Sequence, residues 1–387
     1  MKKTRIALAI SASIFASSAI ATNGTNMIAV GAQANAMGGS GTAAFYGAEN
    51  VIVNPGLIGK AEGTEFAFGG AIFMPSVSTS YTTNPASSTD NTSGANLNLI
   101  PSVATTSRIN DNWTFGIGMF GTSGMGVDYR SNASLFKAQS QLQIMRFVPT
   151  LAYNESNFGV GFSPVIQYGS LDIHFNNGVQ DYGQGAASDL GYGMNIGGYF
   201  DVTPEFTLAA SYQSAINMKY DAQLSTAGAA FGQTFGDELE QPAEIKVGAS
   251  YTMNKMTYTA DYKQVQWGQA KGYKDYNWQD QTVIALGAKY TEKDYWLGAG
   301  YNNAAQPIKE DTNPAVNMFN NIFFPATVES HYTVGGGINI SKSATLEGSI
   351  AYAPETSTTV DVSGLGMGES TTKHSQIGYT VAVRYNF

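Results

Sequence analysis

The end of the chain alternates between apolar and polar positions. One set of side chains is apolar and includes three aromatic residues: Ile377, Tyr379, Val381, Val383, Tyr385 and Phe387. Between them lie Gln376, Gly378, Thr380, Ala382, Arg384 and Asn386. Because successive side chains of a β-strand point to opposite faces, this pattern predicts a strand with one apolar face. An outer-membrane β-barrel turns such a face to lipid and the other face to its lumen.

The same period of two recurs along most of the chain. It predicts about fourteen strands, at residues 64–81, 95–107, 112–127, 138–153, 157–173, 189–201, 205–221, 242–252, 256–269, 280–291, 294–303, 327–340, 344–354 and 375–387. Short turns near residues 110–112, 154–156, 202–204, 253–255, 291–293 and 341–343 alternate with long loops. Transmembrane barrels combine short periplasmic turns with long extracellular loops in this way. The predicted fold is therefore all-β, a 14-stranded antiparallel transmembrane β-barrel.

The N-terminus has the features of a secretory signal peptide. Lys2, Lys3 and Arg5 precede an apolar run over residues 6–20, which ends at a small-x-small cleavage site. Residues 1–21 are therefore predicted to be a signal peptide. No later segment has the roughly 18 consecutive apolar residues of a spanning helix. Any passage through a membrane must then use strands.

Composition narrows the possible classes of function. Charged residues make up 13% of the chain, against roughly 25% in soluble domains. Loss of three basic residues with the signal peptide takes Lys and Arg from 20 to 17, against 29 Asp and Glu, so no nucleic-acid partner is expected. The absence of cysteine removes thiolate metal sites and cysteine nucleophiles. A secreted β-sandwich or β-solenoid is the alternative to a membrane barrel.

Residues 22–60 do not follow the alternation. They are rich in Gly, Ala and Asn and end just before the first predicted strand. A barrel of this size leaves a lumen wider than side chains can fill. We interpret residues 22–60 as an N-terminal hatch that plugs the lumen and residues 61–387 as the barrel. The alternative is that residues 22–60 form a periplasmic tail.

Two short motifs stand out within this predicted hatch. The stretch Gly31 to Gly41 contains the core Met37-Gly38-Gly39, and Asn54-Pro55 lies just before the first strand. Together with the signal peptide, the strand number and the terminal Phe387, these motifs resemble the FadL/TodX family of outer-membrane transporters for hydrophobic compounds. The resemblance covers the whole mature chain. The family usually reads Asn-Pro-Ala at the second motif, where this chain has Gly56.

This resemblance implies passive uptake of long-chain fatty acids or hydrocarbons, without a cofactor, across the outer membrane of a Gram-negative bacterium. It implies capture by extracellular loops, passage to a pocket against the hatch, and sideways release at a kink in the third strand. Glycines within that strand, 112–127, fit a bend, and the kink is expected at Gly121, Thr122, Ser123 and Gly124. The alternative is that these glycines only thin the wall against the hatch.

The interpretation as an outer-membrane barrel also predicts two further partners. Phe387 is expected to be recognised by the barrel-assembly machinery, and outer-membrane lipid is expected to surround a monomeric barrel. A structural or adhesive surface protein and a polar-solute porin remain alternative functions.

Two predicted extracellular loops are unusually apolar. Residues 314–325 contain Phe319, Phe323 and Phe324, and residues 223–239 carry Phe231 and Phe235 at near-helical spacing. Exposed apolar patches commonly mark binding sites, so these five side chains are candidate ligand contacts in a capture groove. The alternative is that the two loops pack on each other as a lid.

Inward-facing cations are candidates for binding a ligand carboxylate. Parity along the strands turns Arg146, Lys219 and Arg384 to the lumen, and arginine binds a carboxylate through two parallel hydrogen bonds. The alternative is that the inward charges pair with one another and hold the wall and the hatch together. His331 and Glu329 are interpreted as a hydrogen-bonded pair. No catalytic residue and no metal-ligand set is predicted.

Overall fold

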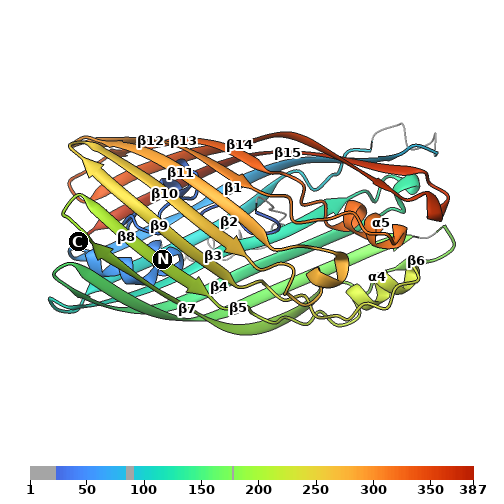
Figure 1. Ribbon diagram of the computed structural model, residues 1–387, viewed down its shortest axis with the longest axis horizontal. Coiled ribbons are helices and arrows are strands. Elements are labelled where there is room, and N and C mark those ends of the chain that lie inside the picture. The colour runs from blue at the N-terminus through green and yellow to red at the C-terminus, as the bar shows by residue number, and fades with distance from the viewer. Residues whose placement is uncertain (1–22, 84–90, 177) are drawn as a thin grey trace, which may run out of the picture.

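The architecture is a barrel of long antiparallel strands. A computed structural model describes residues 23–83, 91–176 and 178–387. Within these ranges fourteen strands of at least 8 residues form one sheet (Figure 1). They are β1 (Thr64–Tyr81), β2 (Asn98–Arg108), β3 (Trp113–Asp128), β4 (Gln139–Glu155), β5 (Phe158–Asn176), β7 (Ala187–Asp201), β8 (Phe206–Gln213), β9 (Glu244–Met253), β10 (Met256–Val265), β11 (Gln281–Thr291), β12 (Tyr295–Ala304), β13 (Ser330–Asn339), β14 (Ala344–Asp361) and β15 (Glu369–Asn386). A two-residue strand, β6 (Asp181–Tyr182), adds to the end of β5.

The sheet closes on itself. Neighbours in sequence pair with each other, and β15 pairs with β1 from Glu65↔Asn386 to Tyr81↔Ser370. The short turns lie at the same end as the C-terminus, and α4 (Leu224–Ala230) and α5 (Pro314–Phe323) lie in loops at the opposite end (Figure 1). The predicted barrel of fourteen antiparallel strands is confirmed. The predicted signal peptide, residues 1–21, lies outside the described residues.

The alternating apolar and polar residues of the sequence form the outer and inner faces of the barrel wall. In β15, Tyr379 and Val381 are 38% and 56% exposed, whereas Thr380 and Arg384 between and beyond them are buried. Exposed Phe, Leu, Ile, Val and Tyr side chains continue this apolar surface around the other strands. The polar face of each strand therefore lines the interior, as the sequence predicts.

Two parts of the predicted strand pattern are wrong. The strand predicted at 205–221 ends at Gln213, and Ile216 and Met218, which parity placed outward, are fully buried. The predicted loop 355–374 is largely paired strand, because β14 runs to Asp361 and β15 begins at Glu369. Both differences lie toward the loop end of the barrel, where apolar side chains pack on loops and no longer report a lipid-facing wall.

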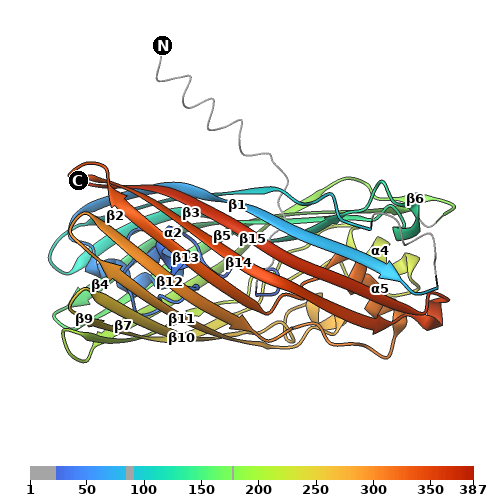
Figure 2. The same cartoon turned by 90° about the horizontal axis from the view of Figure 1, so that it is seen from above.

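The hatch segment lies inside the barrel (Figure 2). Its short elements are α2 (Ala32–Ala36), α3 (Asn50–Val53) and η1 (Pro55–Lys60). The loops carry three more 3-10 turns, η3 (Ala133–Leu135), η4 (Tyr273–Tyr276) and η5 (Ser363–Leu365). In the part of the chain that the structure describes, no helix is both long and apolar enough to span a membrane.

Candidate functional site

The Met37-Gly38-Gly39 core docks the hatch on the wall. Gly38 has φ +70°, and a Cβ there would lie 2.7 Å from the Tyr301 backbone nitrogen of β12. Gly39 has φ +79°, and a Cβ there would overlap the Ile28 carbonyl oxygen. Positive φ and close backbone approach both require glycine. Met37 is fully buried beside these glycines.

The Asn54-Pro55 turn docks on another part of the wall. Asn54 Nδ2 donates to the Thr42 carbonyl oxygen at 2.8 Å and to the Gly198 carbonyl oxygen of β7 at 3.1 Å. Its Oδ1 accepts from the Gly56 backbone nitrogen at 3.1 Å. A Cβ on Gly56 would lie 2.8 Å from the Gly197 carbonyl oxygen. Glycine at this position therefore lets the turn approach β7 more closely than alanine would.

Arg384 joins the hatch to the wall. Its Nη2 lies 3.1 Å from Glu49 Oε2 of the hatch and 3.1 Å from Glu347 Oε2 of β14, and its Nη1 pairs with Glu65 of β1. All four side chains are buried. With three carboxylates around it, this guanidinium has no free edge for a ligand carboxylate. The prediction that Arg384 binds ligand is wrong, and the structural alternative holds for this residue.

Two other polar predictions are also wrong. Lys219 lies beyond the end of β8, is exposed, and pairs with Asp221 at 2.6 Å, so it does not face the lumen. Glu329 is exposed, and His331 Nε2 instead lies 3.3 Å from Gln376 Oε1. Parity fails at both places because the strand has ended or not yet begun.

A cavity lies between the hatch and the wall, where residues of β3, β4 and β8 to β12 line it. It has about 820 Å³ of space between atoms, including the part open to solvent. Residues 26–30 of the hatch form one side. Charged side chains of the wall line the other side: Arg146, Glu244, Lys246, Asp261 and Lys263.

The two acids of this cavity are already partnered. Glu244 lies 3.2 Å from Lys246 Nζ and accepts from Asn26 Nδ2 at 2.8 Å. Asp261 accepts from the backbone nitrogens of Gly41 and Thr42, each at 2.8 Å. Both carboxylates therefore hold hatch residues in place.

The cations are less fully partnered. Arg146 is buried, and its Nε donates to Gln167 Oε1 at 2.9 Å. Among residues 23–83, 91–176 and 178–387, no carboxylate lies within 4.0 Å of Arg146 or of Lys263. Sequence parity placed Arg146 inward but gave no sign that it shares one cavity with Lys246 and Lys263.

The wall is irregular beside this cavity. The register between β3 and β4 shifts between Gly121 and Ser123, where the kink was predicted. Pairing of β2 with β3 stops at Ser102↔Phe120. Beyond that point the hatch takes the place of β2, since Met27 N donates to the Thr122 carbonyl oxygen and Gly124 N to the Thr25 carbonyl oxygen, both at 3.0 Å.

The five candidate phenylalanines of the loops pack together. Phe319, Phe323 and Phe324 of α5 and its C-cap are at most 1% exposed. Phe235 lies 5.2 Å from Phe319, and Phe231 lies 6.3 Å from Phe323, between ring centroids. Phe231 and Phe235 are half-buried. This arrangement corresponds to the lid alternative, and we call these five residues the lid.

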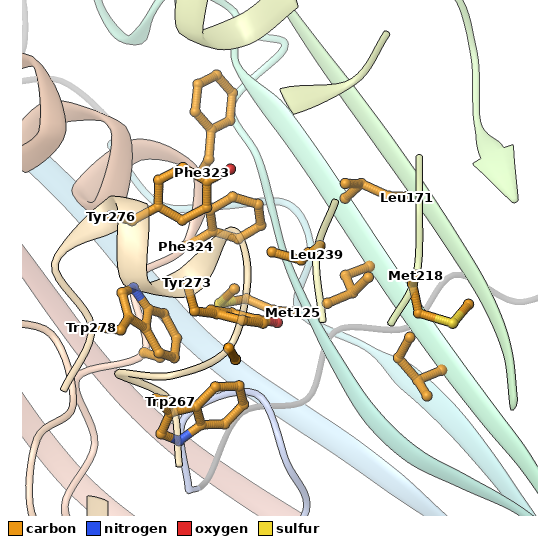
Figure 3. Close-up of a cluster of buried hydrophobic side chains, with 14 of the residues drawn as sticks. Met125, Leu171, Met218, Leu239, Trp267, Tyr273, Tyr276, Trp278, Phe323 and Phe324 are labelled. Atoms are coloured by element: carbon orange, nitrogen blue, oxygen red, sulfur yellow. The ribbon is translucent and has the colours of Figure 1, made fainter. Parts of the chain in front are cut away.

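An aromatic column continues from the lid toward the hatch (Figure 3). Tyr276 lies 4.7 Å from Phe319, Tyr273 lies 4.8 Å from Trp278, and Trp267 lies 4.6 Å from Tyr273, between ring centroids. Burial raises the pKa of Tyr273 and Tyr276, so both phenols stay uncharged. The Tyr273 hydroxyl lies 3.4 Å from Thr25 Oγ1 of the hatch. An uncharged, largely apolar column thus connects the loops to the hatch.

Comparison with known proteins gives a family and several structural relatives. Residues 8–387 match the family described as outer membrane protein transport protein (OMPP1/FadL/TodX). The fold is similar to the P. putida toluene transporter TodX, with a TM-score of 0.70 and 18% identity over 92% of this chain and 98% of that chain. It is also similar to a Pseudomonas aeruginosa FadL homologue, with a TM-score of 0.74 and 13% identity over 94% of this chain and 100% of that chain. No curated protein sequence matches the chain.

The family match spans nearly the whole chain and agrees with the closed barrel. Identities below 20% with the solved structures show a shared fold and no more. The family places the protein among outer-membrane β-barrels of Gram-negative bacteria that transport hydrophobic compounds and are not enzymes. The chain belongs to the OMPP1/FadL/TodX family of outer-membrane transport proteins.

Proposed function

We propose that the protein is a passive channel for hydrophobic molecules that carry a carboxylate, such as long-chain fatty acids. The observation that carries this proposal is the cavity between the hatch and the wall. Three cations, Arg146, Lys246 and Lys263, face two acids there, Glu244 and Asp261. An ionised carboxylic acid would balance the charge of this lining.

Arg146 is the residue best suited to bind the carboxylate. A buried charge is costly unless it is paired, and the described residues supply Arg146 with only an amide oxygen at Nε. Its outer nitrogens suit a two-pronged bond to a carboxylate. Residues Met27 to Val30 provide the apolar side of the same cavity for the ligand's hydrocarbon chain.

Entry through the loops requires the lid to open. The lid phenylalanines are packed against one another and the aromatic column runs below them. A hydrophobic ligand can replace these ring contacts with contacts of its own, whereas a hydrated ion cannot. This supports a route for apolar molecules over one for polar solutes.

Exit takes place sideways at the irregular part of β3 in this proposal. The wall between β2 and β3 is completed there only by the hatch residues Thr25 to Met27. Withdrawal of these few residues would open the wall without breaking any pairing between strands. The ligand would then enter the outer-membrane lipid beside β3.

Binding of laurate to the purified full-length protein in lipid nanodiscs tests the proposal. We expect Arg146→Gln to weaken binding by roughly tenfold or more, because a hydrogen bond to a charged group contributes about 1.5–3 kcal/mol. Arg130→Gln is the matched control, since Arg130 is exposed and pairs with Asp128 at 2.6 Å. Equal laurate affinity in the two variants would contradict the proposal, and strong binding of toluene under the same conditions would indicate a hydrocarbon channel instead.

A further inference from the structure

A second cavity lies on the other side of hatch residues 27–29. It has about 400 Å³ of space between atoms, including the part open to solvent. Met27, Ile28 and Ala29 line both cavities, so this segment separates them. The wall of the second cavity belongs to β1, β2, β13, β14 and β15, and its apolar lining includes Ala71, Phe73, Ile100, Ala351 and Gly378. No Asp, Glu, Lys or Arg is among its lining residues.

Two histidines and a glutamine form a chain of hydrogen bonds at this cavity. His374 Nδ1 lies 2.8 Å from the Pro325 carbonyl oxygen, and His374 Nε2 lies 3.1 Å from Gln376 Nε2. Gln376 Oε1 lies 3.3 Å from His331 Nε2. His331 and Gln376 line the cavity, and all three side chains are at most 4% exposed.

The direction of this chain is fixed at its far end. A carbonyl oxygen only accepts, so His374 carries its proton on Nδ1 and leaves Nε2 as an acceptor. The Gln376 amide group then donates to His374, and its oxygen accepts from His331 Nε2. Within the described ranges neither imidazole lies within 4.0 Å of a carboxylate, so both are neutral. His331 Nδ1 is therefore left without a proton and must act as an acceptor.

His331 Nδ1 has no hydrogen-bond partner among the described residues. A second acceptor in the same cavity, Asn35 Oδ1, also has no partner among the described residues, while the nitrogen of the same amide donates to Thr380 Oγ1 at 2.8 Å. Buried polar atoms without a partner are rare and costly. Two bare acceptors on an apolar wall suit a ligand that brings its own hydrogen-bond donor.

We propose that this second cavity binds small uncharged molecules with an apolar body and one hydroxyl group, such as alkylphenols. The hydroxyl donates to His331 Nδ1, and the hydrocarbon part lies against Phe73 and Ile100. The inference rests on the proposed function only in that ligands reach the lumen. It assigns neutral hydroxyl compounds to one side of residues 27–29 and carboxylates to the other.

The test compares p-cresol with p-xylene, which have nearly the same shape but differ in a hydroxyl and a methyl group. Both are measured by equilibrium dialysis against the full-length protein in lipid nanodiscs, with empty nanodiscs as the blank. We expect His331→Gln, which keeps the bond to Gln376 but lacks the Nδ1 acceptor, to lower the ratio of p-cresol to p-xylene affinity. The loss should be roughly threefold to tenfold, the effect of one neutral hydrogen bond. His331→Asn, which can present an amide oxygen near the position of Nδ1, should retain most of the ratio.

A third variant tests the direction of the hydrogen bonds that join His374, Gln376 and His331. Gln376→Met frees His331 to carry its proton on either ring nitrogen, so the cavity should lose its preference for p-cresol over 4-methylanisole, which only accepts. A merely structural role of Gln376 would change all three affinities together. An unchanged p-cresol to p-xylene ratio in His331→Gln would overturn the inference. A crystal structure of the p-cresol-treated protein with only a water molecule between His331 and Asn35 would also overturn it.

The two proposals fail separately. If both proposals are correct, laurate binding measured on the same samples is weakened by substitution of Arg146 and not by substitution of His331. An unchanged laurate affinity in Arg146→Gln would reject the carboxylate site and would leave the p-cresol result intact. The reverse outcome would reject only the hydroxyl site.

Discussion

Arg384 of the last strand and Glu49 of the hatch form a buried ion pair, with Nη2 3.1 Å from Oε2. The same guanidinium also neutralises Glu65 and Glu347. We predict that Arg384→Met destabilises the folded barrel by about 3–5 kcal/mol, because it leaves buried carboxylates without a counter-charge. Urea unfolding followed by the heat-modifiable mobility of the barrel on gels measures the change. Arg130→Met is the control, since its exposed pair with Asp128 is expected to contribute only about 0–1 kcal/mol; equal effects would contradict the assigned role.

A disulfide between the hatch and β3 should block release. Thr25 Oγ1 and Ser123 Oγ lie 2.8 Å apart, and the chain contains no cysteine of its own. In the double variant Thr25→Cys/Ser123→Cys we expect oxidation to reduce fatty-acid uptake by cells to the level of a strain without the protein, and dithiothreitol to restore it. The two single variants serve as controls. Unchanged uptake in the oxidised double variant would exclude release beside β3.

The lid depends on a hydrogen bond between two loops. Trp278 Nε1 donates to Asn320 Oδ1 of α5 at 3.0 Å, and both side chains are at most 1% exposed. Trp278→Phe leaves this buried acceptor without its donor, at a cost of about 1–3 kcal/mol. We expect faster proteolysis within residues 304–326. Trp113→Phe, at an exposed position near a short turn, should leave the cleavage rate unchanged; equal rates in both variants would show that the bond does not hold the lid.

Removal of the hatch should convert the channel into an open pore. Hatch residues lie in the lumen and contact the wall at well-separated strands, at Tyr301 of β12 and at Gly198 of β7. In planar bilayers we expect low ion conductance for the intact protein and a large increase after deletion of residues 22–60. High conductance of the intact protein would favour the polar-solute porin. An adhesive protein would instead lose cell binding when residues 304–326 are removed, without any change in hydrocarbon uptake.

Much of the wall could be predicted from the sequence because lipid and lumen impose opposite chemistry on alternate residues. The pattern at Tyr379, Thr380 and Val381 is read directly from hydropathy. The prediction weakened where lipid no longer contacts the strand. Ile216 and Met218 are apolar because they are buried against glycines of β5 and β7, and hydropathy does not distinguish that environment from lipid.

The candidate site was harder to predict because it depends on distances across the lumen. From the alternation of the strands alone, Arg146 and Arg384 are equivalent candidates for binding a ligand carboxylate. The difference between them lies in Glu49, Glu65 and Glu347, which are far apart in sequence and meet only around Arg384. The grouping of Lys246 and Lys263 with Arg146 likewise depends on how the hatch folds against the wall.

The position of Arg384 also constrains the order in which the protein assembles. Glu49, Glu65 and Glu347 all precede Arg384 in the chain, and β15 pairs with β1 to close the sheet. β15 lies between β14 and β1, so Glu347 and Glu65 come together only when β15 has paired with both strands. We therefore expect docking of the hatch and closure of the barrel to stabilise each other, because both depend on the positive charge that the C-terminal strand supplies.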